Sequence, residues 1–259
     1  MMNENADDLQ KHLQPLLTGR FSAARLFCLN EVDSTNLFLK GQAPNFPEEA
    51  IALALSQTAG LGRRGRPFQT TPGEAMHLSF LLREPVIESS LPLKIGLAVQ
   101  QAFTTLSGDG FLLKWPNDLL LEGKKVGGIL CESIPSGVIC GIGANLLLPP
   151  SFFTTHDLPH AASIKMIKGK APSIAEAAAK IAFRIEQVLA ENTEKTLLSY
   201  SAHCTTLGSQ IRISEPDGSI TEGVAECITP QGELVIHTPS ARRVICAGDV
   251  SIRGLHGYI

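Results

Sequence analysis

The most informative part of this sequence is Lys114-Trp-Pro-Asn-Asp118, followed by Lys124-Lys-Val-Gly-Gly-Ile-Leu130. The first segment holds the only tryptophan of the chain, and the second places Lys125 before two glycines, whose missing side chains let a ligand approach the backbone. Taken singly, a Pro-Asn-Asp turn and a Lys-Lys pair are typical of an exposed hairpin. The two segments together, at this spacing, are too specific a pattern to be explained by an ordinary exposed hairpin. Within it, the Asn117 amide can read an adenine edge, and Asp118 can either hold a magnesium ion or orient a lysine.

A second motif lies upstream, at Gln57-Thr-Ala-Gly-Leu-Gly-Arg-Arg-Gly-Arg66, directly after a predicted buried strand at 51–55. Its G-x-G-x-x-G spacing would suit a dinucleotide only if the loop opened into a helix. Pro67 and the turn at 70–73 leave no room for a helix before the next predicted strand. What remains is a flexible glycine-rich loop with three arginines, whose guanidinium forks suit phosphate and carboxylate. A solvated basic hairpin turn is the alternative.

Two shorter motifs complete the set. Asp33-Ser-Thr-Asn36 lies just ahead of a helical stretch, where these residue types also occur as N-caps. Gly141-Ile-Gly-Ala-Asn145 ends a predicted strand. Its glycines and asparagine could pack under a nucleotide, and a simple strand-end turn is the alternative.

Hydrophobic periodicity predicts the remaining elements. Strands are expected at 51–55, 76–82, 111–114, 119–121, 128–132 and 137–143, and helices at 8–20, 91–106 and 173–191. Ser173 and Glu176 fit a capping box at the start of the last helix. Short β-prone segments separated by turns then predict a small β-barrel, at 210–213, 221–228, 233–237, 243–246 and 250–253. The domain boundary falls between Thr193 and Thr206.

The composition excludes several classes of protein. The chain has 259 residues, 44% of them hydrophobic and 18% charged, which excludes a disordered or coiled-coil chain. A net charge of -3 gives no basic field for nucleic acid, and aromatic residues make up only 5%. No apolar run is long enough to span a membrane, and the acidic, polar start is not a signal peptide. We expect a soluble cytoplasmic protein whose six cysteines are reduced thiols without zinc-ligand spacing.

The chain resembles the biotin protein ligases in the order of its motifs, D-S-T-N, Q-x-A-G-x-G-R-R-G-R, K-W-P-N-D with K-K-V-G-G-I-L, and G-I-G-x-N. The resemblance implies an α+β fold with a mixed β-sheet flanked by helices, as in class II aminoacyl-tRNA synthetases and biotin ligases, and a small C-terminal SH3-like β-barrel. It also implies three parts: an N-terminal extension with a short helix (1–26), a catalytic biotin- and ATP-binding domain (27–203) and the barrel (204–259).

In that family the reaction has two steps. The biotin carboxylate attacks the α-phosphate of Mg-ATP to give biotinyl-5'-AMP. The ε-amine of one lysine on a biotin carboxyl carrier protein, here that of acetyl-CoA carboxylase, then takes the biotinyl group. The resemblance therefore implies biotin and ATP as substrates and Mg2+ as the ion. No covalent enzyme intermediate is needed, so positioning and charge stabilisation carry the catalysis.

The resemblance also assigns residues. Catalytic roles fall to Lys125 and Arg63, and Lys124 is expected to be a solvated neighbour. The residues expected to bind biotin are Ser34, Thr35, Asn36, Gln57, Gly60, Leu61, Gly62, Arg63 and Lys125. Those expected to bind ATP are Arg63, Arg64, Arg66, Trp115, Asn117, Asp118, Lys125 and Asn145, with Asp118 as the metal residue for magnesium.

Two departures from the family pattern matter. Leu61 occupies a loop position that is usually arginine, which weakens a charge argument there. The loop at 149–164 contains no tryptophan to cover the adenine. Phe152, Phe153 or His160 are the candidates for that role, if any residue fills it.

Three other functions stay open. A lipoate-protein ligase would share the fold, although K-W-P-N-D favours biotin. A biotin-sensing repressor would need an N-terminal winged helix-turn-helix, whereas residues 1–26 hold one helix at most, so we expect no DNA binding. A biotin-binding regulator without catalysis is disfavoured by the intact Lys125 and Arg63. We expect no membrane partner, and a homodimer formed through a sheet edge is compatible with the family.

Overall fold

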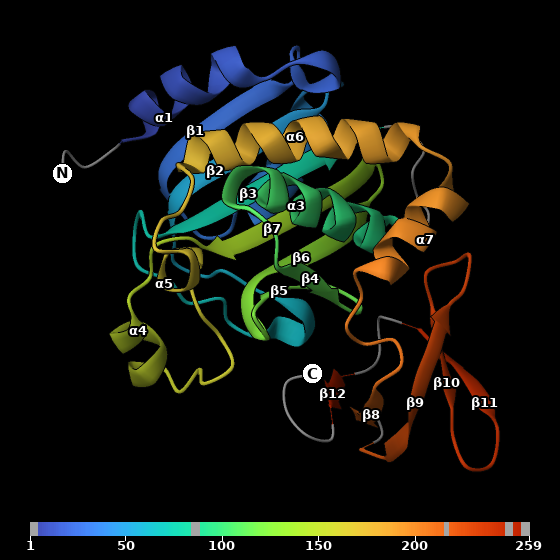
Figure 1. Ribbon diagram of the computed structural model, residues 1–259. Helices are drawn as coiled ribbons and strands as arrows, with labels where there is room; N and C mark the ends of the chain where they lie inside the picture. Colours follow the sequence, from blue (N-terminus) through green and yellow to red (C-terminus); the bar gives the residue numbers. More distant parts are fainter. Residues whose placement is uncertain (1–4, 84–88, 215–217, 247–250, 255–259) are drawn as a thin grey trace.

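The computed structural model describes residues 5–83, 89–214, 218–246 and 251–254. It contains a large mixed sheet flanked by helices and, towards the C-terminus, a smaller antiparallel sheet that lies beside it (Figure 1). The α+β class predicted from the sequence is thereby confirmed. Among the residues that the structure describes, no helix is long and apolar enough to cross a membrane.

The large sheet has seven strands. Their spatial order is β1 (Arg25–Val32), β2 (Ala50–Gln57), β3 (Ala75–Leu82), β7 (Gly137–Asn145), β6 (Lys124–Ile134), β5 (Asp118–Leu121) and β4 (Phe111–Lys114). β1 and β2 run parallel, and every other neighbouring pair is antiparallel. The strands predicted by periodicity are confirmed with the same or slightly longer bounds, except that the strand predicted at 128–132 extends over the whole of β6. Periodicity did not predict β1.

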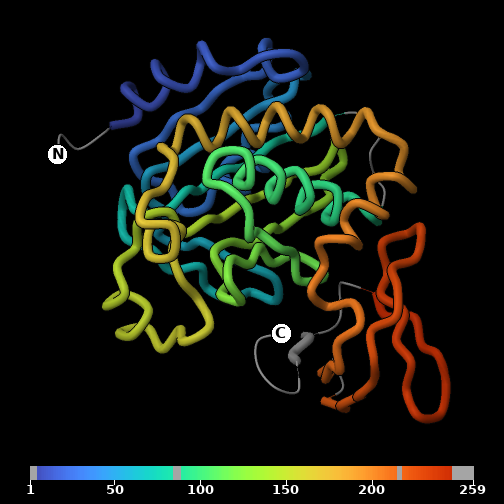
Figure 2. Tube along the Cα trace, viewed as in Figure 1, coloured from blue at the N-terminus to red at the C-terminus, as the bar shows by residue number. Residues whose placement is uncertain are grey.

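The described residues form seven α-helices: α1 (Ala6–Leu13), α2 (Thr35–Gln42), α3 (Leu91–Ser107), α4 (Pro150–Thr155), α5 (Ile164–Lys168), α6 (Ile174–Ala190) and α7 (Thr193–Ala202). α3 and α6 pack against each other and cover one face of the sheet (Figure 1, Figure 2). α6 begins at the predicted capping box, where Ser173 Oγ accepts from the Glu176 N–H (3.2 Å) and Glu176 Oε2 accepts from the Ser173 N–H (3.0 Å). Hydrogen bonds from the Ser173 hydroxyl and backbone lower the pKa of the Glu176 carboxyl.

Side chains of β3 alternate between the two faces of the sheet. Met76, Leu78 and Phe80 are fully buried in the core beneath α3 and α6. His77 and Ser79 occupy the intervening positions and therefore point to the opposite face. That second face is partly covered by α2, which contacts β2, β3 and β7. The alternation thus directs two polar side chains away from the main core.

The N-terminal segment differs from the single helix predicted over 8–20. α1 ends at Leu13, and two short 3-10 turns replace the rest of the predicted helix. Pro15 explains the early end, because proline lacks an N–H and its ring clashes with the preceding turn of an α-helix. Leu9 and Phe21 are fully buried in the main core, so this segment packs into the large domain.

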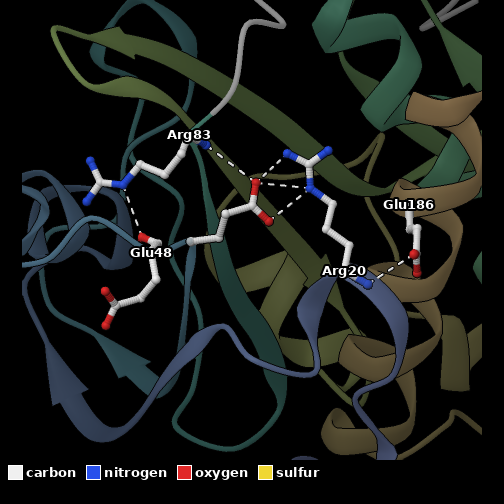
Figure 3. A network of polar contacts seen from close by, with 5 residues as sticks. Arg20, Glu48, Arg83 and Glu186 are labelled. Atoms are coloured by element: carbon white, nitrogen blue, oxygen red, sulfur yellow. Dashed lines mark hydrogen bonds and ion pairs between the residues drawn. The ribbon is translucent and has the colours of Figure 1, made fainter.

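Arg20 joins the N-terminal segment to the sheet and to α6 (Figure 3). Its backbone N–H donates to Glu186 Oε1 (3.0 Å), and its guanidinium pairs with the Glu49 carboxylate just before β2. Arg83, which follows β3, donates from its backbone N–H to the same carboxylate (3.4 Å) and from Nε to the Glu48 carbonyl oxygen (3.0 Å). These contacts hold four chain segments together and fix α1 against the large domain.

The smaller sheet has five strands in the order β11 (Arg242–Ile245), β10 (Leu234–His237), β9 (Ile220–Ile228), β8 (Gln210–Ser214) and β12 (Ser251–Gly254). Neighbouring strands are antiparallel throughout. Its buried side chains are Ile211, Ile213, Ala225, Leu234, Ile236 and Ile245. This arrangement agrees with the predicted SH3-like unit. Val250, the first residue of the last predicted strand, lies outside the described residues.

The smaller sheet docks on the Lys114–Asp118 turn. Trp115 is buried, and its Nε1–H donates to the Gly232 carbonyl oxygen (3.0 Å). Its backbone N–H donates to Thr206 Oγ1 (2.9 Å). Two residues earlier, the Leu113 N–H donates to the His203 carbonyl oxygen (2.8 Å). The turn that carries the K-W-P-N-D motif is therefore held in place by hydrogen bonds to the C-terminal part of the chain.

Candidate active site

One cavity of about 430 Å³ is lined by residues from all four motifs. The predicted site residues that line it are Ser34, Thr35, Asn36, Gln57, Leu61, Gly62, Arg63, Arg64, Arg66, Trp115, Asn117, Asp118, Lys125 and Asn145. Gly60 is the exception. A Cβ there would lie 2.6 Å from Gln57 Nε2 and 3.0 Å from the Phe68 carbonyl oxygen. Glycine at this position therefore lets Gln57 and Phe68 pack closely against the loop backbone.

Lys125 is held by Asp118. The two residues lie on the neighbouring strands β6 and β5, and Lys125 Nζ is 2.5 Å from Asp118 Oδ1. Lys114 is buried and is the register partner of Asp118 on β4, so the carboxylate has a second cationic side chain beside it. Gly127 is required for backbone packing, because a Cβ there would lie 2.8 Å from the Gly143 carbonyl oxygen.

Of the two roles predicted for Asp118, its contact with Lys125 supports the one that orients a lysine. Mg2+ needs oxygen ligands and is usually bound by one or two carboxylates together with substrate phosphates and water. The carboxylates that line the cavity are Asp118 and Asp157. No group of three His, Cys, Asp or Glu side chains suited to a metal occurs within the described part of the chain. The residues present therefore fit a magnesium ion that arrives with a phosphate ligand.

Arg63 ties the glycine-rich loop to the Pro-Asn-Asp turn. Its Nη1 donates to Asn117 Oδ1 (3.1 Å), and Asn117 Nδ2 donates to the Ile129 carbonyl oxygen (3.2 Å). Residues 63–65 form a single 3-10 turn, in which Arg64 has a φ of 59°. The loop then leads into β3 without an α-helix, and every residue in between is described. The dinucleotide-binding interpretation is excluded on this ground.

Ser34 occupies the N-cap position of α2, but its side chain makes no capping hydrogen bond. The side chain is buried and lines the cavity instead. The N-cap alternative for the 33–36 motif therefore accounts for the backbone position of Ser34. It does not account for the Ser34 hydroxyl, which lines the cavity.

Five polar side chains form a continuous network beside this motif. Thr35 donates from its N–H and its hydroxyl to Gln57 Oε1 (2.8 and 2.9 Å). Ser79 Oγ lies 2.7 Å from both Thr35 Oγ1 and Asn36 Oδ1. Asn36 Nδ2 in turn donates to Glu132 Oε2 (2.6 Å). The network joins α2 to β2, β3 and β6 and holds the amide of the motif in place.

Gly141 and Gly143 line the cavity, so their packing under a nucleotide stays a prediction. Side chains of the chain itself also approach both glycines closely. A Cβ at position 141 would lie 2.4 Å from Asn36 Oδ1, and one at position 143 would lie 2.6 Å from Phe68 Cε1. Asn145 is buried at the end of β7 and lines the cavity, and its contact with a ligand stays a prediction.

Phe68 and His77 form one wall of the cavity. Their rings meet edge-on, with centroids 5.8 Å apart. His77 Nε2 lies 3.0 Å from Thr70 Oγ1, and its Nδ1 has no hydrogen-bond partner among the described residues. Burial lowers the pKa of His77 to about 4. The imidazole is therefore neutral near pH 7 and adds no charge to the cavity.

Sequence reasoning missed Ser79, Glu132, His77 and Phe68. For two of them a signal existed, because His77 and Ser79 alternate with large apolar residues within 75–82 and so share one face of a strand. Glu132 and Phe68 stand next to the recognised motifs, but nothing in their local pattern shows which side chains they contact.

A loop at 157–161 is fixed beside Lys125. The Lys125 N–H donates to the His160 carbonyl oxygen (2.8 Å). Lys124 Nζ donates to the Pro159 carbonyl oxygen (2.7 Å), so the lysine expected to be a solvated neighbour also contacts this loop. The loop therefore forms part of the cavity wall.

Of the three aromatic candidates for covering a nucleotide base, His160 lines the cavity and the two phenylalanines do not. Phe153 is buried, and Phe152 stacks on His156 with ring centroids 4.1 Å apart. Leu158 joins His160 in the cavity wall. The loop thus offers a histidine and a leucine to the cavity and no tryptophan.

Comparison with known proteins gives the family. Residues 28–145 match the model of the biotin/lipoate A/B protein ligase family, and residues 206–253 match that of the biotin protein ligase C terminal domain. The chain is 30% identical over 256 residues to the biotin--[acetyl-CoA-carboxylase] ligase of Mycobacterium tuberculosis (strain ATCC 25618 / H37Rv), an alignment that covers 93% of this chain and 94% of that protein. The chain belongs to the biotin protein ligase family.

Two further comparisons agree with this assignment. The biotin--[acetyl-CoA-carboxylase] ligase of Paracoccus denitrificans is 30% identical over 242 residues, which cover 87% of this chain and 100% of that protein. A solved structure, the biotin protein ligase from Aquifex aeolicus in complex with biotin and ATP, matches with a TM-score of 0.77 at 28% identity, over 89% of this chain and 99% of that one. As a biotin protein ligase, the chain is an enzyme of the ligase class, and its fold is the one that the resemblance predicts.

Proposed function

We propose that this enzyme activates biotin with Mg-ATP as biotinyl-5'-AMP and transfers the biotinyl group to a lysine of the biotin carboxyl carrier protein of acetyl-CoA carboxylase. The observation that carries the proposal is the convergence of four separated motifs on one cavity, which combines a polar network with a group of cations. The names of the relatives, and the biotin and ATP in the Aquifex aeolicus complex, support the same substrates.

The ureido ring of biotin would be bound by the network around Thr35 and Gln57. A cyclic urea presents two N–H donors and one carbonyl acceptor, and each needs a partner in a closed site because an unpaired polar group costs binding energy. Thr35 Oγ1 can accept and the Ser34 hydroxyl can donate, while Gln57 Oε1, which accepts from the Thr35 N–H and hydroxyl, holds Thr35 in place. Phe68 supplies an apolar wall for the rest of the bicyclic ring.

Lys125 and Arg63 would stabilise the first chemical step. A biotin carboxylate oxygen attacks the α-phosphorus of ATP, a P–O bond forms, and pyrophosphate leaves. Both reactants are anions, so cations that are already in place lower the barrier. Asp118 fixes Lys125, whose Nζ lies 2.5 Å from Asp118 Oδ1. Magnesium bound with ATP would neutralise phosphate charge, and Asp118 and Asp157 are the lining carboxylates that could hold it.

The second step needs no nucleophile from the enzyme. The ε-amine of the carrier lysine attacks the acyl carbon of the mixed anhydride, an amide bond forms, and AMP leaves with the electrons of the broken C–O bond. Until then the adenylate must be kept from water. We assign this protection to the glycine-rich loop and to the 157–161 loop, which both line the cavity. Asn117 and Asn145 would contact the adenine, with His160 beside it.

A lipoate-protein ligase is the second candidate, since the matched family model covers biotin and lipoate ligases alike. Lipoate has no urea group, so the buried network of Thr35, Asn36, Gln57 and Ser79 would face a ligand without matching donors. This network favours biotin.

We place the reaction in the cytoplasm, which agrees with six cysteines that are thiols and not disulfides.

The proposal is tested by exchange of labelled pyrophosphate into ATP. Exchange should require magnesium and biotin and should not occur with lipoate. In a second assay, labelled biotin should be incorporated into a purified biotin carboxyl carrier domain and not into a variant whose acceptor lysine is alanine. Exchange that responds to lipoate and ignores biotin would contradict the proposal.

A further inference from the structure

The side-chain amide of Asn36 has one orientation that is consistent with its neighbours. Its Nδ2 faces two groups that can only accept a hydrogen bond, Glu132 Oε2 at 2.6 Å and the Leu130 carbonyl oxygen at 3.4 Å. Its Oδ1 faces the Ser79 hydroxyl at 2.7 Å. Turning the amide over would place Oδ1 against a carboxylate, so Glu132 fixes which end of the amide points to Ser79.

Packing leaves Asn36 no other position. The residue is 6% exposed, and Ser79 is fully buried. On the side of β7, a Cβ at Gly141 would lie 2.4 Å from Asn36 Oδ1, which shows how closely the amide approaches the strand. The amide therefore cannot swing aside to relieve a bad contact, and its hydrogen-bond partners decide its orientation.

This orientation decides where the proton of Ser79 goes. Ser79 Oγ lies 2.7 Å from Asn36 Oδ1 and 2.7 Å from Thr35 Oγ1, so one O–H serves two acceptors. Because Asn36 presents its oxygen, it draws on this proton, and Thr35 Oγ1 keeps a lone pair for a ligand N–H. If Nδ2 faced Ser79 instead, the amide would be the donor. Ser79 would then give its proton to Thr35 alone, and one of the two lone pairs of Thr35 Oγ1 would be fully occupied, which weakens this oxygen as an acceptor for a ligand.

We infer that Glu132 is a positioning residue for biotin. Acting through Asn36 and Ser79, it keeps Thr35 Oγ1 available as an acceptor for a ureido N–H. Glu132 itself does not line the cavity, whereas Asn36 and Thr35 do. The inference rests on the proposed function and adds to it a carboxylate that controls the polarity of the binding site without touching the substrate.

Glu132→Leu tests the inference, with Glu31→Leu on the exposed side of β1 as the matched control. Leucine keeps much of the bulk and removes the acceptor. Loss of a hydrogen bond to a charged group corresponds to about 10- to 100-fold in an equilibrium constant, so the KM for biotin should rise by that factor. The KM for ATP, and kcat at saturating biotin, should stay at the values of the parent enzyme. Glu31→Leu should change none of these quantities.

Exchanging the two side chains separates orientation from stability. Asn36→Asp alone sets two carboxylates against each other and should raise the KM for biotin at least as much as Glu132→Leu. In the double variant N36D/E132Q, the glutamine amide can donate to one oxygen of the new carboxylate at position 36. The second oxygen of that carboxylate then faces Ser79 as an acceptor. The KM for biotin should therefore return to within about 10-fold of the parent value.

Direct titration of biotin without ATP gives a second readout, and thermal unfolding shows whether each variant is folded. A folded Glu132→Leu variant with the parent KM for biotin would overturn the inference. So would a double variant that is no better than Asn36→Asp, or a rise in the KM for ATP equal to that for biotin. A parent enzyme that neither binds biotin nor catalyses exchange would overturn the proposed function, and the inference with it.

Discussion

Asp118 Oδ1 lies 2.5 Å from Lys125 Nζ, and the ion pair joins two neighbouring strands at the edge of the cavity. A lysine side chain alone is flexible, and fixing it costs conformational entropy. The carboxylate meets that cost during folding, so the cation is already in place when an anionic ligand enters. Such preorganised charge is worth more than charge that must be recruited during the reaction.

Lys125→Ala should reduce biotin-dependent pyrophosphate exchange by roughly 100- to 1000-fold, because it removes a fixed cation from the place where charge develops. Lys124→Ala, one residue earlier, should have a much smaller effect, since the contact seen for Lys124 is with a loop carbonyl. Steady-state exchange rates measure both variants. A larger loss for Lys124→Ala would mean that the reacting phosphate lies beside Lys124.

Asp118→Asn distinguishes holding the lysine from binding the metal. Without the negative charge Lys125 is less well fixed, and exchange should fall by about 10- to 100-fold. The Mg2+ concentration that gives half-maximal exchange should stay the same, and a magnesium titration of both enzymes measures it. A clear shift of that midpoint to higher Mg2+ would instead make Asp118 a metal ligand.

Arg63→Gly should release the adenylate rather than prevent its formation. The variant loses the contact between Arg63 and Asn117, and a further glycine adds roughly 1 kcal/mol of chain entropy that must be lost on ordering the loop. Exchange should be slower but should persist, because Lys125 is unchanged, and bystander proteins such as albumin should become biotinylated. Arg64→Gly is the control, since the φ of 59° at that position suits glycine. A variant that neither catalyses exchange nor labels albumin would mean that the first chemical step cannot proceed without Arg63, and the role in retaining the adenylate would be wrong.

The free energy of unfolding should fall as the pH is lowered through the range between 6.5 and about 4. Burial holds the pKa of His77 at about 4 in the folded chain, against 6.5 for an exposed histidine. In this range the unfolded chain takes up a proton that the folded chain does not, which removes up to ~3 kcal/mol at the acid end. Urea unfolding curves at pH 7 and pH 4.5 measure the change.

The control for this pH dependence is His77→Gln, which stays neutral and can still hydrogen-bond to Thr70. The variant should lose less stability than the parent between the two pH values. If both proteins lose the same amount, other titrating groups cause the change and His77 does not.

Trp115→Phe should lower the free energy of unfolding by about 1 kcal/mol, which corresponds to a few degrees in Tm. The variant removes the indole donor and leaves the Gly232 carbonyl without it. Gly232→Ala probes the same junction from the other side, because its φ is 83° and a Cβ there would lie 2.9 Å from Ser90 Cα. Scanning calorimetry measures both. Parent-like unfolding of both variants would mean that this junction adds nothing to stability.

Local patterns in the sequence were sufficient to locate the strands of the large sheet other than β1, and the binding segments. Alternation of apolar residues defines β3, and the capping box defines the start of α6. The N-terminal helix was predicted too long, because the apolar positions continue past Pro15 while the backbone cannot.

The contacts inside the site could not be derived from local patterns. Gly141 and Gly143 signal a close approach, but the sequence does not show that Asn36 and Phe68 make it. The same holds for Glu132, whose partner lies 96 positions away. Such pairings depend on which strands become neighbours, and this is decided by the whole sheet rather than by any one segment.

The burial of Trp115 at the junction of the two sheets has one more consequence. Because the chain has no other tryptophan, all of its indole fluorescence comes from the place where the small sheet supports the Pro-Asn-Asp turn. Opening of that junction would bring water to the ring and shift the emission to longer wavelength. A ligand that tightens the turn would change the intensity instead. The protein thus carries its own optical probe, which can follow substrate binding and domain docking without any added label.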